Sequence, residues 1–177
     1  MTTRDMVFLA IIAACVTVAG FVMVPLVGMV PLPGMRSLAA AFFYGFFLAL
    51  GLLKVRKTGA VFLVALLNGL VLLMMSWVML ANNIVAGLLT ELLVLAVFRG
   101  YGSDRAVLVG AGSYICMSLP ASFLLAAWLG GPMLGRFLTH PAVVVLIFSA
   151  TALLSFGGAW AGLKVGRELV KAGVIRR

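Results

Sequence analysis

The feature that most constrains this chain is a succession of long apolar runs that are almost free of charge. An α-helix needs about 20 such residues to cross the hydrocarbon core of a bilayer. The second and fourth runs are short for a full crossing, which is tolerable where protein rather than lipid surrounds them. The pattern predicts six membrane-spanning helices, over residues 6–24, 38–53, 59–80, 84–98, 107–129 and 142–163.

The composition agrees with a membrane location. Hydrophobic residues make up 65% of the 177 residues and charged residues 10%, against about 45–50% and 25% in soluble domains. We expect a single membrane domain over residues 1–177 and no separate soluble domain. The net charge of +9 does not indicate nucleic-acid binding, because the basic residues cluster at the ends of the apolar runs, as membrane topology requires.

The distribution of the basic residues predicts the orientation. With the N-terminus in the cytoplasm, only Arg36 and Arg136 fall on the outer side, and eleven basic residues fall on the inner side. Since cytoplasmic loops carry the excess of Lys and Arg, we predict an all-α bundle with both termini inside. The outer segments "PLVGMVPLPGMR" and "GGPMLGRFLTHP" are apolar and rich in Pro and Gly, so we expect them to cover the bundle as lids.

Glu91 is the one acidic residue within a predicted span. A carboxylate at the centre of a membrane helix costs roughly 2.5–3.5 kcal/mol on insertion scales, and such residues are functional hypotheses by default. Gly87 and Asn83 share its helix face. In one interpretation Glu91 meets a bound cation or a donor-rich ring beside Gly87, in a cavity open to the outside. In the other it is structural, bonded to Asn68 or paired with Arg36.

The other polar and aromatic residues of the spans also have two interpretations. Asn68 suits either helix contact or ligand binding. Asn82 and Asn83 are predicted to close a tight outer turn between the third and fourth spans, with the capping chemistry that Asn provides. Trp77 and Tyr114 are able to stack on a flat ligand, but aromatic residues also anchor helices at the membrane interface.

The sequence gives no support for an enzyme. Ser113 is predicted near the inner end of its span and His140 near the outer side, too far apart for a nucleophile and its base. His140 lacks a partner at metal-ligand spacing, and Cys15 and Cys116 lie singly within apolar runs. We therefore expect no metal site and no cofactor. No G-x-x-x-x-G-K-[ST] motif occurs, so ATP hydrolysis would reside in partner subunits.

Ala10 and Ala14 give the first predicted helix a face of small residues. Such faces let helix backbones approach closely. The face therefore serves either packing within this bundle or docking to another membrane protein.

Together, these features resemble the substrate-binding S components of energy-coupling factor transporters, which are six-helix proteins of this length. The opening "TTRDMVFLAIIAAC" is similar to their first helix, which carries an alanine motif. Within that group the chain resembles the YkoE-like members, associated with thiamine or its hydroxymethylpyrimidine moiety. The stretches "KVRKTGAVFLVALLNGLVLLMMS", "NIVAGLLTELLVLAVF" and "GLKVGRELVKAGVI" carry this likeness.

The resemblance implies a protein of a prokaryotic plasma membrane that captures a vitamin from the outside. It implies partners: a transmembrane coupling protein, docked at Ala10 and Ala14, and two ATPases. It also implies a pocket formed by the outer loops and helices four to six, with the Glu91 carboxylate facing the positive thiazolium of thiamine. The expected substrate-binding residues are Glu91, Asn83, Asn68, Gly87, Trp77, Tyr114 and Arg36.

Two alternatives remain open. In one, the chain is an S component for a more lipophilic ligand such as haem. In the other, it is a small membrane adaptor or assembly protein in which Glu91 is purely structural.

Overall fold

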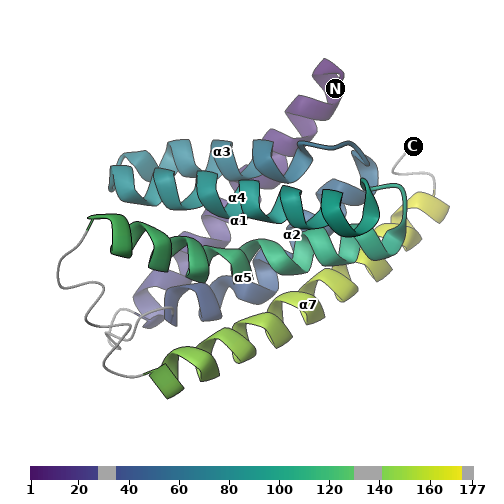
Figure 1. Cartoon of the computed structure of the whole chain (residues 1–177). Helices are drawn as coiled ribbons and strands as arrows, with labels where there is room; N and C mark the ends of the chain where they lie inside the picture. The colour runs from purple at the N-terminus through teal and green to yellow at the C-terminus, as the bar shows by residue number, and fades with distance from the viewer. Residues whose placement is uncertain (28–34, 130–140, 173–177) are drawn as a thin grey trace.

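The computed structural model describes residues 1–27, 35–129 and 141–172, and the secondary structure of these residues is entirely helical (Figure 1). Five of the helices are long and apolar enough to cross a membrane, and α3, with 14 residues, is shorter. The prediction of an all-α, multi-pass membrane protein is thus confirmed. The helices are α1 (Thr3–Val27), α2 (Met35–Lys54), α3 (Ala60–Leu73), α4 (Trp77–Phe98), α5 (Asp104–Leu129) and α7 (Pro141–Lys171).

The predicted boundary between the third and fourth spans was wrong. The second and fourth helices have 20 and 22 residues and are not short, whereas the third ends at Leu73. The helix α4 begins after Ser76, which is its N-cap. Ser76 has an extended backbone, and its side-chain oxygen accepts a hydrogen bond from the Val78 N–H at 3.3 Å. Asn82 and Asn83 therefore lie inside α4 and not in a turn.

Basic residues gather at one end of the bundle. The start of α1, the end of α7 and the α2–α3 and α4–α5 connections lie together there (Figure 1). Three of the four acidic residues form ion pairs there: Asp5 with Lys57, Asp104 with Arg56 and Arg167, and Glu168 with Lys171. We call this the basic end, and define it by Arg4, Lys54, Arg56, Lys57, Arg99, Arg105, Lys164, Arg167 and Lys171.

The helices α2 and α7 pack very closely along a row of glycines. A Cβ atom added to Gly158 would lie 2.0 Å from the carbonyl oxygen of Phe42, and one added to Gly162 would lie 2.4 Å from that of Phe46. From the α2 side, a Cβ on Gly45 would meet the Ser155 carbonyl oxygen at 2.1 Å. Small residues at such contacts let helix backbones approach in a membrane, so α2 and α7 pack backbone to backbone along this row.

Candidate functional site

Four polar side chains from four helices meet inside the bundle. The amide oxygen of Asn83 in α4 accepts hydrogen bonds from Asn68 Nδ2 in α3, at 3.0 Å, and from the Tyr114 hydroxyl in α5, at 2.7 Å. The Thr17 hydroxyl in α1 donates to Asn68 Oδ1 at 2.8 Å. We call Thr17, Asn68, Asn83 and Tyr114 the asparagine cluster. The structure thus brings together three of the residues that the sequence singled out, and adds Thr17.

Close approach of α3 and α4 makes this meeting possible. A Cβ atom added to Gly69 would lie 3.2 Å from the Asn83 Cβ and 3.0 Å from a Leu80 methyl group. The neighbouring Asn68 is only 1% exposed and Tyr114 only 3%. Because a buried polar group without a partner is costly, the amides and hydroxyl must bond to one another. Asn83 is less buried, and its amide nitrogen donates to the Met79 carbonyl at 2.8 Å.

Two aromatic rings flank the asparagine cluster. The ring of Tyr44 in α2 stacks on that of Tyr114, with centroids 6.1 Å apart and planes 17° apart. The hydroxyl of Tyr44 lies close to α1, since a Cβ on Gly20 would meet it at 3.1 Å. The cluster and this ring pair together join α1, α2, α3, α4 and α5 around one polar centre.

A second row of polar side chains lies farther from the basic end. Ser122 in α5 donates to Asn82 Oδ1 at 3.0 Å, and the hydroxyls of Ser37 and Ser118 lie 3.4 Å apart. We call Ser37, Asn82, Ser118 and Ser122 the serine row. The sequence analysis missed its three serines, although Ser118 and Ser122, one helical turn apart, would lie on one face of a helix. The serine row thus adds polar groups in the half of the bundle opposite the basic end.

Glu91 lies on the other side of the asparagine cluster. It is eight residues beyond Asn83 in α4, about 12 Å nearer the basic end at 1.5 Å per residue. It is 6% exposed, and its Oε1 accepts hydrogen bonds from the backbone N–H groups of Val61, at 2.9 Å, and Phe62, at 3.3 Å. These groups belong to the first turn of α3 and have no partner within their own helix. The carboxylate therefore caps α3 from a neighbouring helix.

Close helix packing occupies the space beside Glu91. A Cβ atom on Gly87 would lie 2.6 Å from the Cβ of Ala65 in α3. Gly87 thus admits α3 rather than leaving the room that we expected for a ligand. The structural interpretation of Glu91 named Asn68 or Arg36 as partner. The structure gives Asn68 other partners and describes no side chain for Arg36.

Tyr101, in the α4–α5 connection, completes the surroundings of Glu91. It is fully buried, and a Cβ on Gly110 would meet its ring at 2.7 Å. Burial and the nearby Glu91 charge raise the pKa of Tyr101, so the phenol stays protonated. Its hydroxyl and Glu91 Oε2 have no hydrogen-bond partner among the described residues. The sequence analysis missed Tyr101, since a Tyr in a loop gives no sign of burial.

The remaining candidates that the structure describes do not belong to the asparagine cluster. Trp77 is 55% exposed at the start of α4, and Ala10 and Ala14 lie on an exposed face of α1. His140, Arg136 and most of both expected lids fall outside the described residues. Within the described ranges no three His, Cys, Asp or Glu residues gather as metal ligands. The cysteines Cys15 and Cys116 are both free.

Comparison of the chain with models of protein families, with curated proteins and with solved structures finds no match. Its function must therefore be argued from its own residues.

Proposed function

We propose that this chain is the substrate-binding membrane subunit of an importer, of the kind that S components form in energy-coupling factor transporters. The observation that carries the proposal is the asparagine cluster, with Asn83 at its centre bonded to Asn68 and Tyr114. All six helices cross the membrane in this proposal, and the basic end faces the cytoplasm, as the positive-inside rule requires. The cluster and the serine row then lie in the outer half, where a substrate arrives.

The chemistry of the outer half suits a small ring with hydrogen-bonding groups. Asn and Ser side chains both donate and accept hydrogen bonds, and the stacked Tyr44 and Tyr114 add aromatic faces. Binding sites commonly combine apolar and aromatic walls with a few placed polar groups. A bound substrate would exchange hydrogen bonds with Asn83, the least buried member of the asparagine cluster.

The charges favour a neutral substrate. Glu91 is about 12 Å from the level of Asn83, and its Oε1 already accepts two backbone hydrogen bonds. Among the described residues no other acid lies away from the basic end. A thiazolium cation would thus lack a counter-charge in the outer half. Of the two expected substrates, neutral hydroxymethylpyrimidine fits these contacts better than thiamine.

Energy would come from partner subunits. The chain carries no phosphate-binding loop motif, and the exposed face with Ala10 and Ala14 is a place for a transmembrane coupling protein to dock. Two ATPases attached to that protein would then drive release of the substrate to the cytoplasm of a prokaryotic cell.

A binding titration tests the proposal. Purified protein is titrated with hydroxymethylpyrimidine and with thiamine while Trp fluorescence is followed. We expect micromolar or tighter binding of the pyrimidine, weakened at least about tenfold by Asn83→Ala, which corresponds to 1.4 kcal/mol. Ser149→Ala is the control, because among the residues that the structure describes the Ser149 hydroxyl bonds carbonyls of its own helix alone. Equal affinities for Asn83→Ala and the parent would overturn this site.

The capping role of Glu91 favours a second candidate function. A membrane adaptor needs no ligand, and in it the buried carboxylate would serve only the fold, as its bonds to Val61 and Phe62 allow. Folded protein that binds neither compound and carries no small molecule detectable by mass spectrometry would support the adaptor and contradict the importer subunit.

A further inference from the structure

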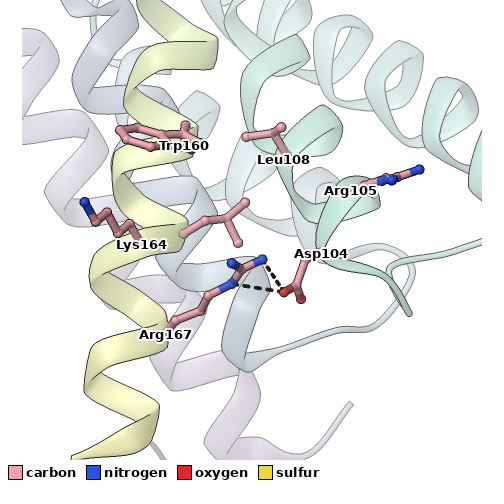
Figure 2. A pocket seen from close by; sticks show the side chains of 7 residues that line it. Asp104, Arg105, Leu108, Trp160, Lys164 and Arg167 are labelled. Carbon is pink, nitrogen blue, oxygen red and sulfur yellow. Dashed lines mark hydrogen bonds and ion pairs between the residues drawn. The ribbon is translucent and has the colours of Figure 1, made fainter.

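A groove of about 360 Å³ opens at the basic end, between the start of α5 and the last turns of α7 (Figure 2). Its polar side chains belong to Asp104, Arg105, Lys164 and Arg167, and Leu108 and Trp160 provide its apolar wall. Both helices are long and apolar enough to cross a membrane, so the groove lies where hydrocarbon gives way to headgroups and water.

The charges in the groove do not balance. Asp104 bonds to Arg56 through Oδ1, and through Oδ2 to Arg167 Nη2 at 2.7 Å and Nε at 3.1 Å. One carboxylate is thereby shared between two guanidinium groups. Arg105 and Lys164 form no ion pair with any residue that the structure describes. The groove therefore carries an excess of positive charge that nothing in the described chain neutralises.

The two unpaired cations flank the groove. In Figure 2 the Arg105 and Lys164 side chains point to opposite sides, and the Asp104–Arg167 pair lies between them. The Lys164 ammonium lies 5.5 Å from the centre of the Trp160 ring. Both side chains are long and exposed, so their charged ends are able to reach an anion at the groove mouth while their stems stay along apolar surface.

The apolar wall distinguishes the class of ligand. Trp160 is 60% exposed and lies about one helical turn before Lys164, and Leu108 faces it from α5. A free phosphate ion would use the cations and leave this wall uncovered. A phospholipid would use both, with its phosphate at the cations and an acyl chain against Trp160 and Leu108. Basic pockets between membrane helices on the cytoplasmic side bind anionic headgroups in this way.

We propose that this groove binds one anionic phospholipid, whose headgroup lies at the groove mouth, attracted by the exposed cations Arg105 and Lys164 on either side, and whose acyl chain lies along Trp160 and Leu108. The site is separate from the asparagine cluster, and its occupation does not depend on what that cluster binds. The lipid would tie α5 to α7 at the basic end, where Asp104 and Arg167 already join them.

Fluorescence quenching tests the proposal in the full-length chain. Trp77→Phe and Trp128→Phe replace the two other, exposed tryptophans and leave Trp160 as the reporter. The protein is placed in phosphatidylcholine bilayers that contain a minor fraction of brominated phosphatidylglycerol or brominated phosphatidylcholine. Since each basic residue near a membrane surface strengthens anionic-lipid binding roughly fivefold, we expect the anionic lipid to compete for the groove at least about fivefold better.

Matched variants distinguish specific lipid binding in the groove from a general attraction of anionic lipid to the basic end. Arg105→Gln with Lys164→Gln should bring the ratio of quenching by the anionic lipid to quenching by phosphatidylcholine close to one, while an unchanged circular dichroism spectrum shows that the fold is intact. Arg4→Gln with Arg99→Gln removes the same charge from exposed residues outside the groove and should keep the preference. Equal quenching by both lipids, or equal losses in the two double variants, would overturn the proposal.

Inorganic phosphate at constant ionic strength distinguishes the two sources of the anion. If phosphate abolishes the lipid preference and changes Trp160 emission in pure phosphatidylcholine, the groove takes the free ion and the lipid proposal fails. A preference that survives millimolar phosphate supports the lipid.

Discussion

Glu91 in α4 holds the first turn of α3 through Val61: its Oε1 accepts the Val61 backbone N–H at 2.9 Å. The N-terminal end of a helix carries unpaired N–H groups and a partial positive charge, so a carboxylate from a neighbouring helix satisfies both. The α3 helix begins directly after Gly59, whose φ of +86° belongs to the left-handed region that favours glycine. No side chain of α3's own N-cap is available, and Glu91 supplies the missing acceptor.

Replacing Glu91 tests this capping role. Glu91→Ala leaves the N–H groups of Val61 and Phe62 without their acceptor, and each unsatisfied buried donor costs roughly 1–3 kcal/mol. We expect a loss of about 2–4 kcal/mol in the free energy of unfolding in mixed micelles, followed by circular dichroism. Glu91→Gln retains a carbonyl acceptor and should lose less. A Glu91→Gln variant with unchanged stability and tenfold weaker ligand binding would instead favour a ligand contact.

The length of the apolar runs was enough to predict the helical fold, because most of these runs are as long as membrane-spanning helices. It did not predict the break between α3 and α4, since Met74 and Met75 continue the apolar run and only Ser76 marks the end. Asparagines are strong turn formers, so the sequence predicts the break at Asn82 and Asn83. In the structure their side chains bond within the bundle, which overrides the local preference.

The candidate site was predicted in part. Asn68, Asn83 and Tyr114 were each singled out as polar or aromatic residues within apolar spans, but their meeting depends on how three helices pack. Thr17 was missed because a single threonine is ordinary in a membrane helix. The partners of Glu91 could not be predicted either. Every residue except proline has a backbone N–H, and the sequence does not show which of these N–H groups lack a partner within their own helix.

The hydrogen bond from Tyr114 to Asn83 is expected to contribute modestly to stability. Tyr114→Phe removes the donor and keeps the ring stacked on Tyr44, so we expect a loss of about 0.6–1.5 kcal/mol in the free energy of unfolding. A double-mutant cycle with Asn83→Ala should show a coupling of similar size. The same cycle with Asn82→Ala serves as control, because Asn82 bonds Ser122 and not Tyr114. Equal couplings in the two cycles would contradict a specific bond.

The start of α4 should depend on Ser76. Ser76→Ala removes the acceptor for the Val78 N–H and is expected to cost about 1 kcal/mol, whereas Ser76→Gly should cost only a few tenths. Hydrogen exchange of the Val78 amide gives a local readout and should speed up about fivefold in Ser76→Ala. Unchanged exchange would mean that the helix begins elsewhere, as at the asparagine pair that the sequence first indicated.

Two adjacent glycines of α7 provide the sharpest test of the α2–α7 contact. A Cβ on Gly158 would lie 2.0 Å from the Phe42 carbonyl oxygen, whereas one on Gly157 would meet nothing within 4 Å. Because the Phe42 oxygen is backbone and cannot rotate away, Gly158→Ala should cost about 3 kcal/mol of unfolding free energy, the upper end for overpacking. Gly157→Ala adds the same methyl group and should be neutral or stabilise by about 0.5–1 kcal/mol, since it removes a helical glycine. Similar stabilities for the two variants in mixed micelles would show that α2 and α7 do not pack backbone to backbone at this level.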